Sequence, residues 1–310
     1  MTAEPLPGVG ARLCLPRDAH IAYVLGRFAA STIEPLWPLH FGSYHTGRRR
    51  IAQLVKLNLV RGFRRRSPSD PTWYSLTRPG LEWVLDEIGC PPEELHLLAS
   101  IQRVNLAALA ERNHLWSSLI RSARESTVAR LALFRPEREL RRLALRAVPP
   151  IPVVPDALFC LEARSLAGDS AAPLANPSAV CFGVELDSGS ERSATWRAKA
   201  RSYRSVGTLY GAEEWLLLVT VPSARRARTI AEAVTGEGLG PVTFLAVAER
   251  LFQGRAFESV LWRADELVAA PMAPPRWSVL DPLSTRHLDQ PGGAAADRGS
   301  NEHPATENRP

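Results

Sequence analysis

The sequence lacks the cysteine pattern of a metal finger and the long apolar run of a membrane span. Its four cysteines are scattered over 310 residues without Cys-x-x-Cys or Cys/His ligand spacing, so we expect neither a zinc site nor a disulfide framework. No apolar stretch approaches the roughly 20 residues that a membrane helix needs, and the N-terminus does not read as a signal peptide. These absences predict a soluble, cytoplasmic protein in a reducing compartment, with no membrane partner.

Several catalytic signatures are also missing. The chain has no Gly-x-x-x-x-Gly-Lys-Ser/Thr loop, so we expect no nucleotide cofactor and no ATP-driven step within this chain. A Gly-x-Ser-x-Gly elbow, which would indicate a serine hydrolase, is absent as well. The seven histidines include no close pair of the kind that holds the metal of conjugative tyrosine relaxases, which sets that class aside.

What the sequence does contain is an ordinary globular composition with one concentrated basic segment. Hydrophobic residues make up 45% and charged residues 23%, values that argue against a disordered or fibrous chain. The net charge is +6, yet residues 35–69 contain no Asp or Glu and hold eight basic residues, more than the whole excess. These eight are Arg48, Arg49, Arg50, Lys56, Arg61, Arg64, Arg65 and Arg66. Such a concentration favours a polyanionic partner.

Residues 18–90 have the pattern of a winged-helix domain. Apolar periodicity predicts helices over 18–30, 32–39 and 46–59, a hairpin with strands at 63–66 and 73–76, and a helix over 79–88. In helix-turn-helix proteins the start of the recognition helix faces base edges while flanking basic groups hold phosphates. We therefore predict that double-stranded DNA contacts the third helix and the wing through Arg48, Arg49, Arg50, Lys56, Arg64, Arg65 and Arg66. A solvated basic face, or a winged helix that binds a protein, is the alternative.

The sequence after the predicted winged-helix domain predicts an α/β domain with a central mixed sheet. We assign residues 1–17 to an N-terminal tail, 91–126 to a helical connector, and 127–268 to the α/β domain. Strands at 131–134, 157–163, 179–187, 215–221 and 242–247 alternate with helices at 136–145, 190–206 and 224–234. Residues 269–310 are predicted to be a disordered tail, because the last 22 residues contain no large apolar side chain.

In the predicted α/β domain, carboxylates occur where one predicted strand begins and another ends. Side chains alternate along a strand, so Glu185 and Asp187 share a face at the end of the strand 179–187. Asp156 immediately precedes another strand and joins them if the two strands are neighbours. Three converging carboxylates suit Mg²⁺ or Mn²⁺, which can activate water near a phosphodiester. Lys199, one helix later, adds a positive charge.

A purely structural interpretation of the same residues stays open. Ser188 and Glu191 have the spacing of a capping box, in which the acids would only start the next helix. Asp187 would then terminate a strand, Asp156 would belong to a turn, and Lys199 would be a solvated helix residue.

Taken in order, these motifs resemble the replication-relaxation family of bacterial plasmids and mobile elements, a winged helix followed by a PD-(D/E)XK-like nuclease fold. The resemblance runs from about Asp18 to Trp262. The residues that carry it are the basic helix, Tyr74-Ser-Leu-Thr77-x-x-Gly80, Val104-Asn105, Arg135-Pro-Glu-Arg-Glu139, Val154-Pro-Asp156, Phe182-Gly-Val-Glu-Leu-Asp-Ser-Gly189, Lys199, Tyr203 and the apolar strand at Trp215.

The resemblance implies a role in plasmid replication and DNA relaxation, with replication or conjugation proteins as partners. It implies that Asp156 and Glu185 are metal ligands and that Glu139 assists them. The third position of the Asp/Glu-x-Lys pattern is Asp187 here, so Lys199 has to replace the missing lysine, which puts hydrolysis in question.

Three functions therefore remain open. The first is a metal-dependent nickase or nuclease. The second is a non-catalytic DNA-binding replication or mobilisation factor, and the third is a transcriptional regulator, which leaves the acids without a role.

Overall fold

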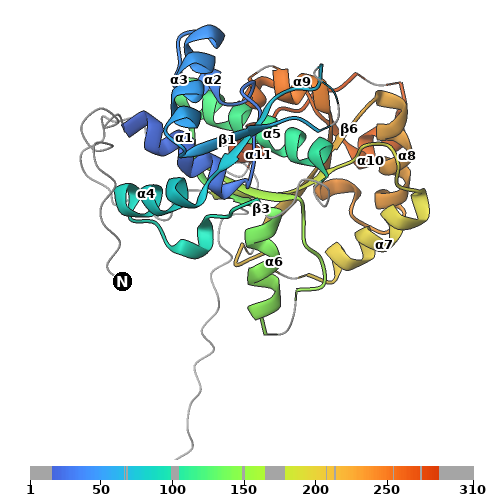
Figure 1. Cartoon of the computed structure of the whole chain (residues 1–310). Coiled ribbons are helices and arrows are strands. Elements are labelled where there is room, and N and C mark those ends of the chain that lie inside the picture. Colours follow the sequence, from blue (N-terminus) through green and yellow to red (C-terminus); the bar gives the residue numbers. More distant parts are fainter. Residues whose placement is uncertain are drawn as a thin grey trace, which may run out of the picture.

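The computed structural model describes residues 16–65, 67, 69–98, 105–148, 151–164, 179–206, 208–212, 214–253, 255–272 and 274–285. These residues form helices and a six-stranded mixed sheet, which confirms the predicted α/β class (Figure 1). Residues 1–15 of the predicted N-terminal tail and 286–310 of the predicted C-terminal tail lie outside the described residues, as does Arg66.

The N-terminal elements follow the predicted order of helices, hairpin and helix. They are α1 (Pro16–Arg27), α2 (Trp37–His40), α3 (Tyr44–Lys56), β1 (Val60–Phe63), β2 (Trp73–Leu76) and α4 (Arg78–Ile88). The first hairpin strand, predicted at 63–66, begins three residues earlier. Asn58 ends α3 with a left-handed backbone at φ 55°, and Gly62 then pairs with Tyr74 inside the ladder. Arg64 and Arg65 consequently lie in the hairpin tip rather than in the strand.

Among the described residues of the predicted helical connector, the α-helix lies in the second part. A short 3-10 turn, η1 (Pro92–Glu94), is followed by the irregular residues 95–98, and α5 (Leu106–Glu125) is the helix of this segment. For residues 95–98 the helix prediction was wrong, because the backbone N–H of His96 bonds to the Gly26 carbonyl of α1 instead of to a carbonyl one turn earlier in its own segment. Among the described helices, α5 included, none is both long and apolar enough to cross a membrane.

The six strands of the sheet lie in the same order in space as in the sequence. They are β3 (Ala129–Pro136), β4 (Ala157–Ala163), β5 (Ala179–Leu186), β6 (Trp215–Val221), β7 (Thr243–Val247) and β8 (Trp262–Arg263). The pairs β3–β4, β4–β5 and β7–β8 are antiparallel, whereas β5–β6 and β6–β7 are parallel. The carboxyl ends of β5, β6 and β7 therefore meet at one edge.

Helices cover both faces of this sheet. The helices that accompany the strands are α6 (Glu137–Arg146), α7 (Ser193–Arg204), α8 (Ala224–Thr235), α9 (Ala248–Gln253), α10 (Ala264–Ala269) and α11 (Asp281–Thr285), with 3-10 turns η3 (Gly240–Val242) and η4 (Ala256–Glu258). One apolar core lies between the sheet and α6, α7, α8 and α10. Figure 1 shows α7, α8 and α10 on the side away from α1–α4.

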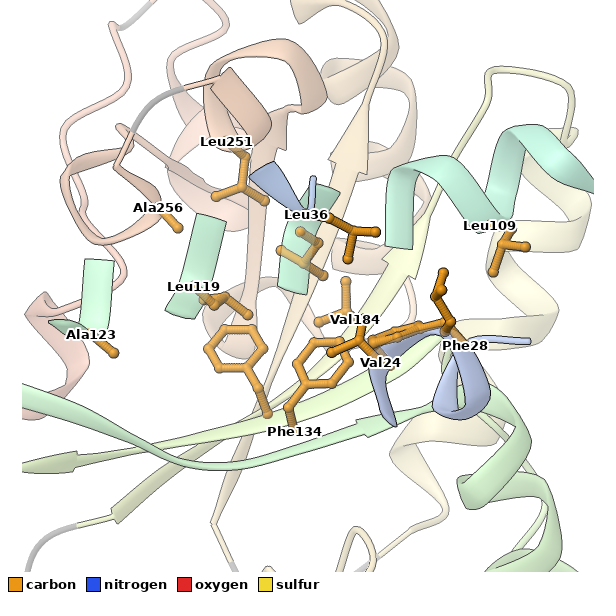
Figure 2. Packing of buried hydrophobic residues seen from close by; sticks show 14 of the residues in the cluster. Val24, Phe28, Leu36, Leu109, Leu119, Ala123, Phe134, Val184, Leu251 and Ala256 are labelled. Carbon is orange, nitrogen blue, oxygen red and sulfur yellow. The ribbon is translucent and has the colours of Figure 1, made fainter. Parts of the chain in front are cut away.

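The second core is continuous from the N-terminal helices to the sheet. Val24 and Phe28 of the α1 region pack with Leu109 of α5, Phe134 of β3 and Val184 of β5 (Figure 2). The predicted units 18–90 and 127–268 thus share one buried interior, with α5 between them. Burial of this apolar surface holds the basic helix in a defined position relative to the sheet.

The prediction of a disordered tail from residue 269 was wrong for its first part. Trp277 pairs with Leu261 and contacts the ring of Phe244, while Val279 and Leu283 are 0% and 6% exposed. These apolar residues pack on the sheet face next to α5. The composition that favours disorder, with no large apolar side chains, belongs only to the sequence after them.

The expectation of no disulfide was also wrong. Cys160 and Cys181 stand opposite each other on β4 and β5 and are joined by a disulfide. Their separation of 21 residues carries no information on strand register, so the cysteine spacing could not reveal the pairing. Cys90 is a free thiol.

Candidate active site and basic face

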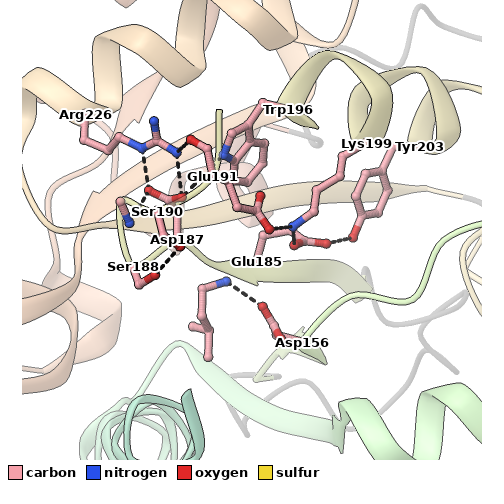
Figure 3. Close-up of polar contacts among 12 residues, drawn as sticks. Asp156, Glu185, Asp187, Ser188, Ser190, Glu191, Trp196, Lys199, Tyr203 and Arg226 are labelled. Atoms are coloured by element: carbon pink, nitrogen blue, oxygen red, sulfur yellow. Dashed lines mark hydrogen bonds and ion pairs between the residues drawn. The ribbon is translucent and has the colours of Figure 1, made fainter. Parts of the chain in front are cut away.

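The end of β5 directs two buried carboxylates toward α7 and α8. Val180, Phe182 and Val184 enter the core next to α5, and Glu185 and Asp187 make their contacts with α7 and α8 (Figure 3). This placement confirms that the two acids lie on the same side of the strand. They are 4% and 5% exposed, and buried carboxylates of this kind need charged or hydrogen-bonding partners.

Glu185 obtains its partners from one face of α7. Its Oε2 accepts from Lys199 Nζ at 2.7 Å, and its Oε1 accepts from the Tyr203 hydroxyl at 2.6 Å. Lys199 and Tyr203 are four residues apart on the helix, so both side chains point the same way. Burial raises the pKa of Glu185, the positive charge of Lys199 lowers it, and the carboxylate of Asp156 raises it; the net direction is upward.

Asp156 lies beside Glu185 because β4 begins where the antiparallel β5 ends (Figure 3). Its backbone N–H bonds to the Val184 carbonyl at 2.9 Å, and its Oδ2 accepts from the Leu186 N–H at 2.9 Å. The other oxygen, Oδ1, is 3.6 Å from Arg112 of α5. Burial raises the pKa of Asp156, which the hydrogen bond from Leu186 partly offsets.

Asp187 does not join the other two acids. Its carboxylate accepts from Arg226 Nε at 2.6 Å and Nη2 at 2.8 Å, and Trp196 Nε1 lies 3.4 Å from Oδ1. Arg226 comes from the first turn of α8, which follows β6. Of the three predicted acids, Asp156 thus lies beside Glu185, whereas Asp187 is paired with Arg226 through both of its oxygens.

The capping-box interpretation is also wrong. Helix α7 starts at Ser193, and no side chain caps it. Glu191 instead forms an ion pair with Lys199 at 2.9 Å, and its carbonyl accepts from Arg226. Glu191 thus connects the ion pairs of Glu185 and Asp187.

Two residues of α5 were missed by the sequence analysis. Arg112 reaches both Asp156 and, at 2.9 Å, Glu137 of α6. The pKa of Glu111 is raised by burial and by the charges of Asp156 and Asp187, so this acid lies in the same electrostatic environment. The adjacent charged residues Glu111 and Arg112, which follow the apolar first turn of α5, were the available signal. Glu139 was expected to assist, but Arg27 of α1 binds it at 2.7 Å.

A divalent metal held by Asp156 and Glu185 would require Glu185 to release Lys199 or Tyr203, because both of its oxygens accept hydrogen bonds in this structure. In the described part of the chain, no group of three or more His, Cys, Asp or Glu side chains is arranged to hold a metal ion. Mg²⁺, however, often takes one or two protein carboxylates and completes its shell with water and phosphate oxygens. Asp156 Oδ1 has only the long contact with Arg112, so it is the most accessible ligand in this pair.

Some of the predicted DNA-binding side chains are exposed to solvent, whereas others form contacts within the protein. On α3, whose start is capped by Ser43, the side chains of Arg48, Arg49 and Lys56 are exposed. Arg50 instead binds the fully buried carboxylate of Asp18, with 2.8 Å between Nε and Oδ1. The prediction that Arg50 contacts the DNA backbone therefore does not agree with the structure, because this side chain links α3 to α1.

The hairpin shows the same division. Arg61 is exposed as well, but its guanidinium donates to the Leu98 carbonyl and the Ser75 hydroxyl. Arg64 and Arg65 are exposed in the tip, where Arg64 donates to Thr72 at 3.2 Å. We call the five exposed residues Arg48, Arg49, Lys56, Arg64 and Arg65 the basic face.

Comparison with known proteins identifies the family of this chain. The family model described as replication-relaxation matches residues 23–214, which include the basic face, Asp156, Glu185, Asp187 and Lys199. The search of curated proteins and the search of solved structures each found no match. Because the matched segment covers more than half of the sequence, the chain belongs to the replication-relaxation family.

Proposed function

We propose that this protein binds double-stranded DNA through its basic face during replication of a plasmid or mobile element. Family membership supports the replication role. The observation that carries DNA binding is the selective exposure of this face. Arg49, Lys56 and Arg65 form no ion pair with an acidic side chain in the part of the chain that the structure describes, whereas Arg50 of the same helix does. Exposed cations on a helix and an adjacent hairpin are groups of the kind that contact the phosphates of a DNA duplex.

Fluorescence anisotropy with a labelled duplex tests this proposal. Binding should weaken with salt, and Arg49→Gln and Lys56→Gln should each reduce the slope of log affinity against log salt by about 1 if each side chain contacts one phosphate. Arg146→Gln is a matched control, because Arg146 is exposed on α6, which lies well away from α3 in Figure 1. An unchanged affinity in the α3 variants would refute the assignment of this face.

A second function, metal-dependent DNA nicking, is favoured by the juxtaposition of Asp156, Glu185 and Lys199. Lys199 Nζ, 2.7 Å from Glu185, favours the ionised form of a carboxylate that burial otherwise disfavours. Asp156 and Glu185 would hold Mg²⁺ or Mn²⁺. A metal in this place supplies charge stabilisation at a phosphodiester and lowers the pKa of bound water. Lys199 and Tyr203 orient Glu185, and the backbone N–H of Leu186 orients Asp156.

Nicking of a supercoiled plasmid with Mg²⁺, Mn²⁺ or a chelator tests this second function. Asp156→Asn and Glu185→Gln should abolish metal-dependent nicking, while Glu162→Gln should retain it. Glu162 is the control because it lies on β4 at the opposite end from Asp156 and pairs with Arg130. Thermal melting of each variant verifies folding. Duplex binding without nicking in the unmodified protein would identify a non-catalytic replication factor.

A further inference from the structure

A cavity of about 390 Å³ lies beside Asp156, where the N-terminal helices meet the sheet. It is lined by the end of α1, the first turns of α5 and α6, and the irregular stretch that contains His96. Phe28 and Leu109 provide apolar lining, and Arg112 and Arg138 provide positive charge. The cavity is separate from the basic face, since it includes none of those five residues.

His96 presents a hydrogen-bond donor that is unused within the described structure. The residue is 5% exposed, and its Nε2 is buried without a hydrogen-bond partner among the described residues. Arg142 Nη2 lies 3.5 Å from Nδ1. An arginine can only donate, so we assign Nδ1 as the acceptor and place the proton of the neutral imidazole on Nε2. A buried N–H without an acceptor points to a ligand oxygen.

The charges around His96 favour an anionic ligand. Arg138 is exposed at the cavity and forms no ion pair with any acid in the described parts of the chain. Glu137 is already bound by Arg112 and Arg141, so its negative charge is balanced. Asp156 also lines the cavity, and its nearest cation is Arg112 at 3.6 Å. The side of the cavity formed by His96 and Arg138 therefore offers donors and positive charge.

We propose that this cavity binds the phosphate of a nucleotide unit, with His96 and Arg138 as donors to its oxygens. A cavity of this volume is in the range that holds small organic ligands and exceeds what one inorganic phosphate fills. Phe28 and Leu109 then contact the nucleoside part. The phosphate belongs either to the end of a DNA strand or to a free nucleoside monophosphate. This site does not depend on duplex binding by the basic face.

Isothermal titration calorimetry with thymidine 5′-monophosphate and thymidine tests the site. The monophosphate should bind at least about ten times more tightly, because charged hydrogen bonds are lost without the phosphate. Arg138→Gln should weaken monophosphate binding about 5–10-fold, and His96→Phe should do so to a similar extent. Arg146→Gln, an exposed arginine at the other end of α6, should leave the affinity unchanged. Since Arg138 is exposed, its variant tests the site even if His96→Phe fails to fold.

A short oligothymidylate with and without a 5′-phosphate distinguishes the two sources. If the phosphorylated oligomer binds more tightly than the free monophosphate, the cavity is assigned to a DNA end. If the two bind equally, it is assigned to a free nucleotide. Both results support a phosphate site. Equal affinities for thymidine and its monophosphate would overturn the proposal. So would equal effects of Arg138→Gln and Arg146→Gln. Duplex binding by Arg138→Gln reports on the basic face separately.

Discussion

Arg226 donates from Nε and Nη2 to the two carboxylate oxygens of Asp187, at 2.6 and 2.8 Å. This pair fastens the first turn of α8 to the end of β5. Because Arg226 Nη2 also reaches the carbonyl of Glu191 at 2.5 Å, the same side chain holds the loop that leads into α7. The position of Lys199, which Glu191 also binds, thus depends on a contact outside the carboxylate pair.

Replacing Arg226 should destabilise the fold strongly. The side chain of Asp187 is 0% exposed, so Arg226→Met leaves a buried carboxylate without its charge partner, and the free energy of unfolding should fall by about 3–5 kcal/mol. Urea denaturation measures this loss. Combining Arg226→Met with Asp187→Leu should restore part of the lost stability, because the unpaired charge is gone. A loss below about 1 kcal/mol in the single variant would contradict a stabilising role of the Arg226–Asp187 pair.

Lys199→Met should move the pH dependence of the site. Lys199 lowers the pKa of Glu185, which burial raises, so removing the lysine raises that pKa further. Glu185 then ionises only at higher pH, and the acidic limb of Mn²⁺ binding or of nicking should shift to higher pH. Titration with Mn²⁺ monitored by electron paramagnetic resonance provides a readout independent of activity. Lys199→Arg, which keeps the charge, should shift the profile less.

Arg49→Gln and Arg50→Gln should affect different properties although the residues are adjacent: the first DNA affinity, the second stability. Arg49 is exposed, so its loss should reduce DNA affinity and leave stability within about 0.5 kcal/mol of the original. Arg50 binds Asp18, whose side chain is 0% exposed, so its loss should lower the free energy of unfolding by about 3–5 kcal/mol. Anisotropy and urea denaturation of both variants check this division. Equal effects on stability would contradict it.

Gly80→Ala should be poorly tolerated. A Cβ at this position would lie 1.9 Å from the carbonyl oxygen of Leu59, so the start of α4 would have to move away from the strand that follows Leu59. We expect a loss of about 3 kcal/mol or more in the free energy of unfolding. Gly42→Ala is the control, since nothing lies within 4 Å of a Cβ there. Chemical denaturation of the pair measures the difference; similar stabilities would argue against this close approach.

Stability should depend on His96 in mildly acidic solution. Burial, with Arg138 and Arg142 nearby, lowers the pKa of His96 from 6.5 to about 4. Between these values the unfolded chain binds a proton that the folded chain does not, so stability falls as pH decreases from about 6.5 toward 4 and is complete above that window. His96→Phe should therefore lose less stability than the unmodified protein between pH 7.5 and 5. Urea denaturation at both pH values measures this, and parallel losses would show that His96 does not contribute.

Elements with a strong apolar pattern were predictable from the sequence. The strands at 157–163 and 215–221 have the predicted bounds, because each is a nearly continuous apolar run that is buried on both faces. The described residues 95–98 were not predictable in the same way. Leu95 and Leu98 have helical spacing, but the hydrogen bond from the His96 N–H to the Gly26 carbonyl holds this stretch in an irregular path.

The sequence by itself determined that Glu185 and Asp187 lie on the same face of β5, since side chains alternate along any strand. It also determined the location of the positive charge, because the basic residues are concentrated in one segment. Only the tertiary structure decided which partner each acid has. The antiparallel pairing of β4 with β5 brings Asp156 to Glu185, and the parallel pairing of β5 with β6 brings Arg226 to Asp187. Strand neighbours and register follow from the packing of the whole core, so residues far apart in the chain meet at distances that no local pattern encodes.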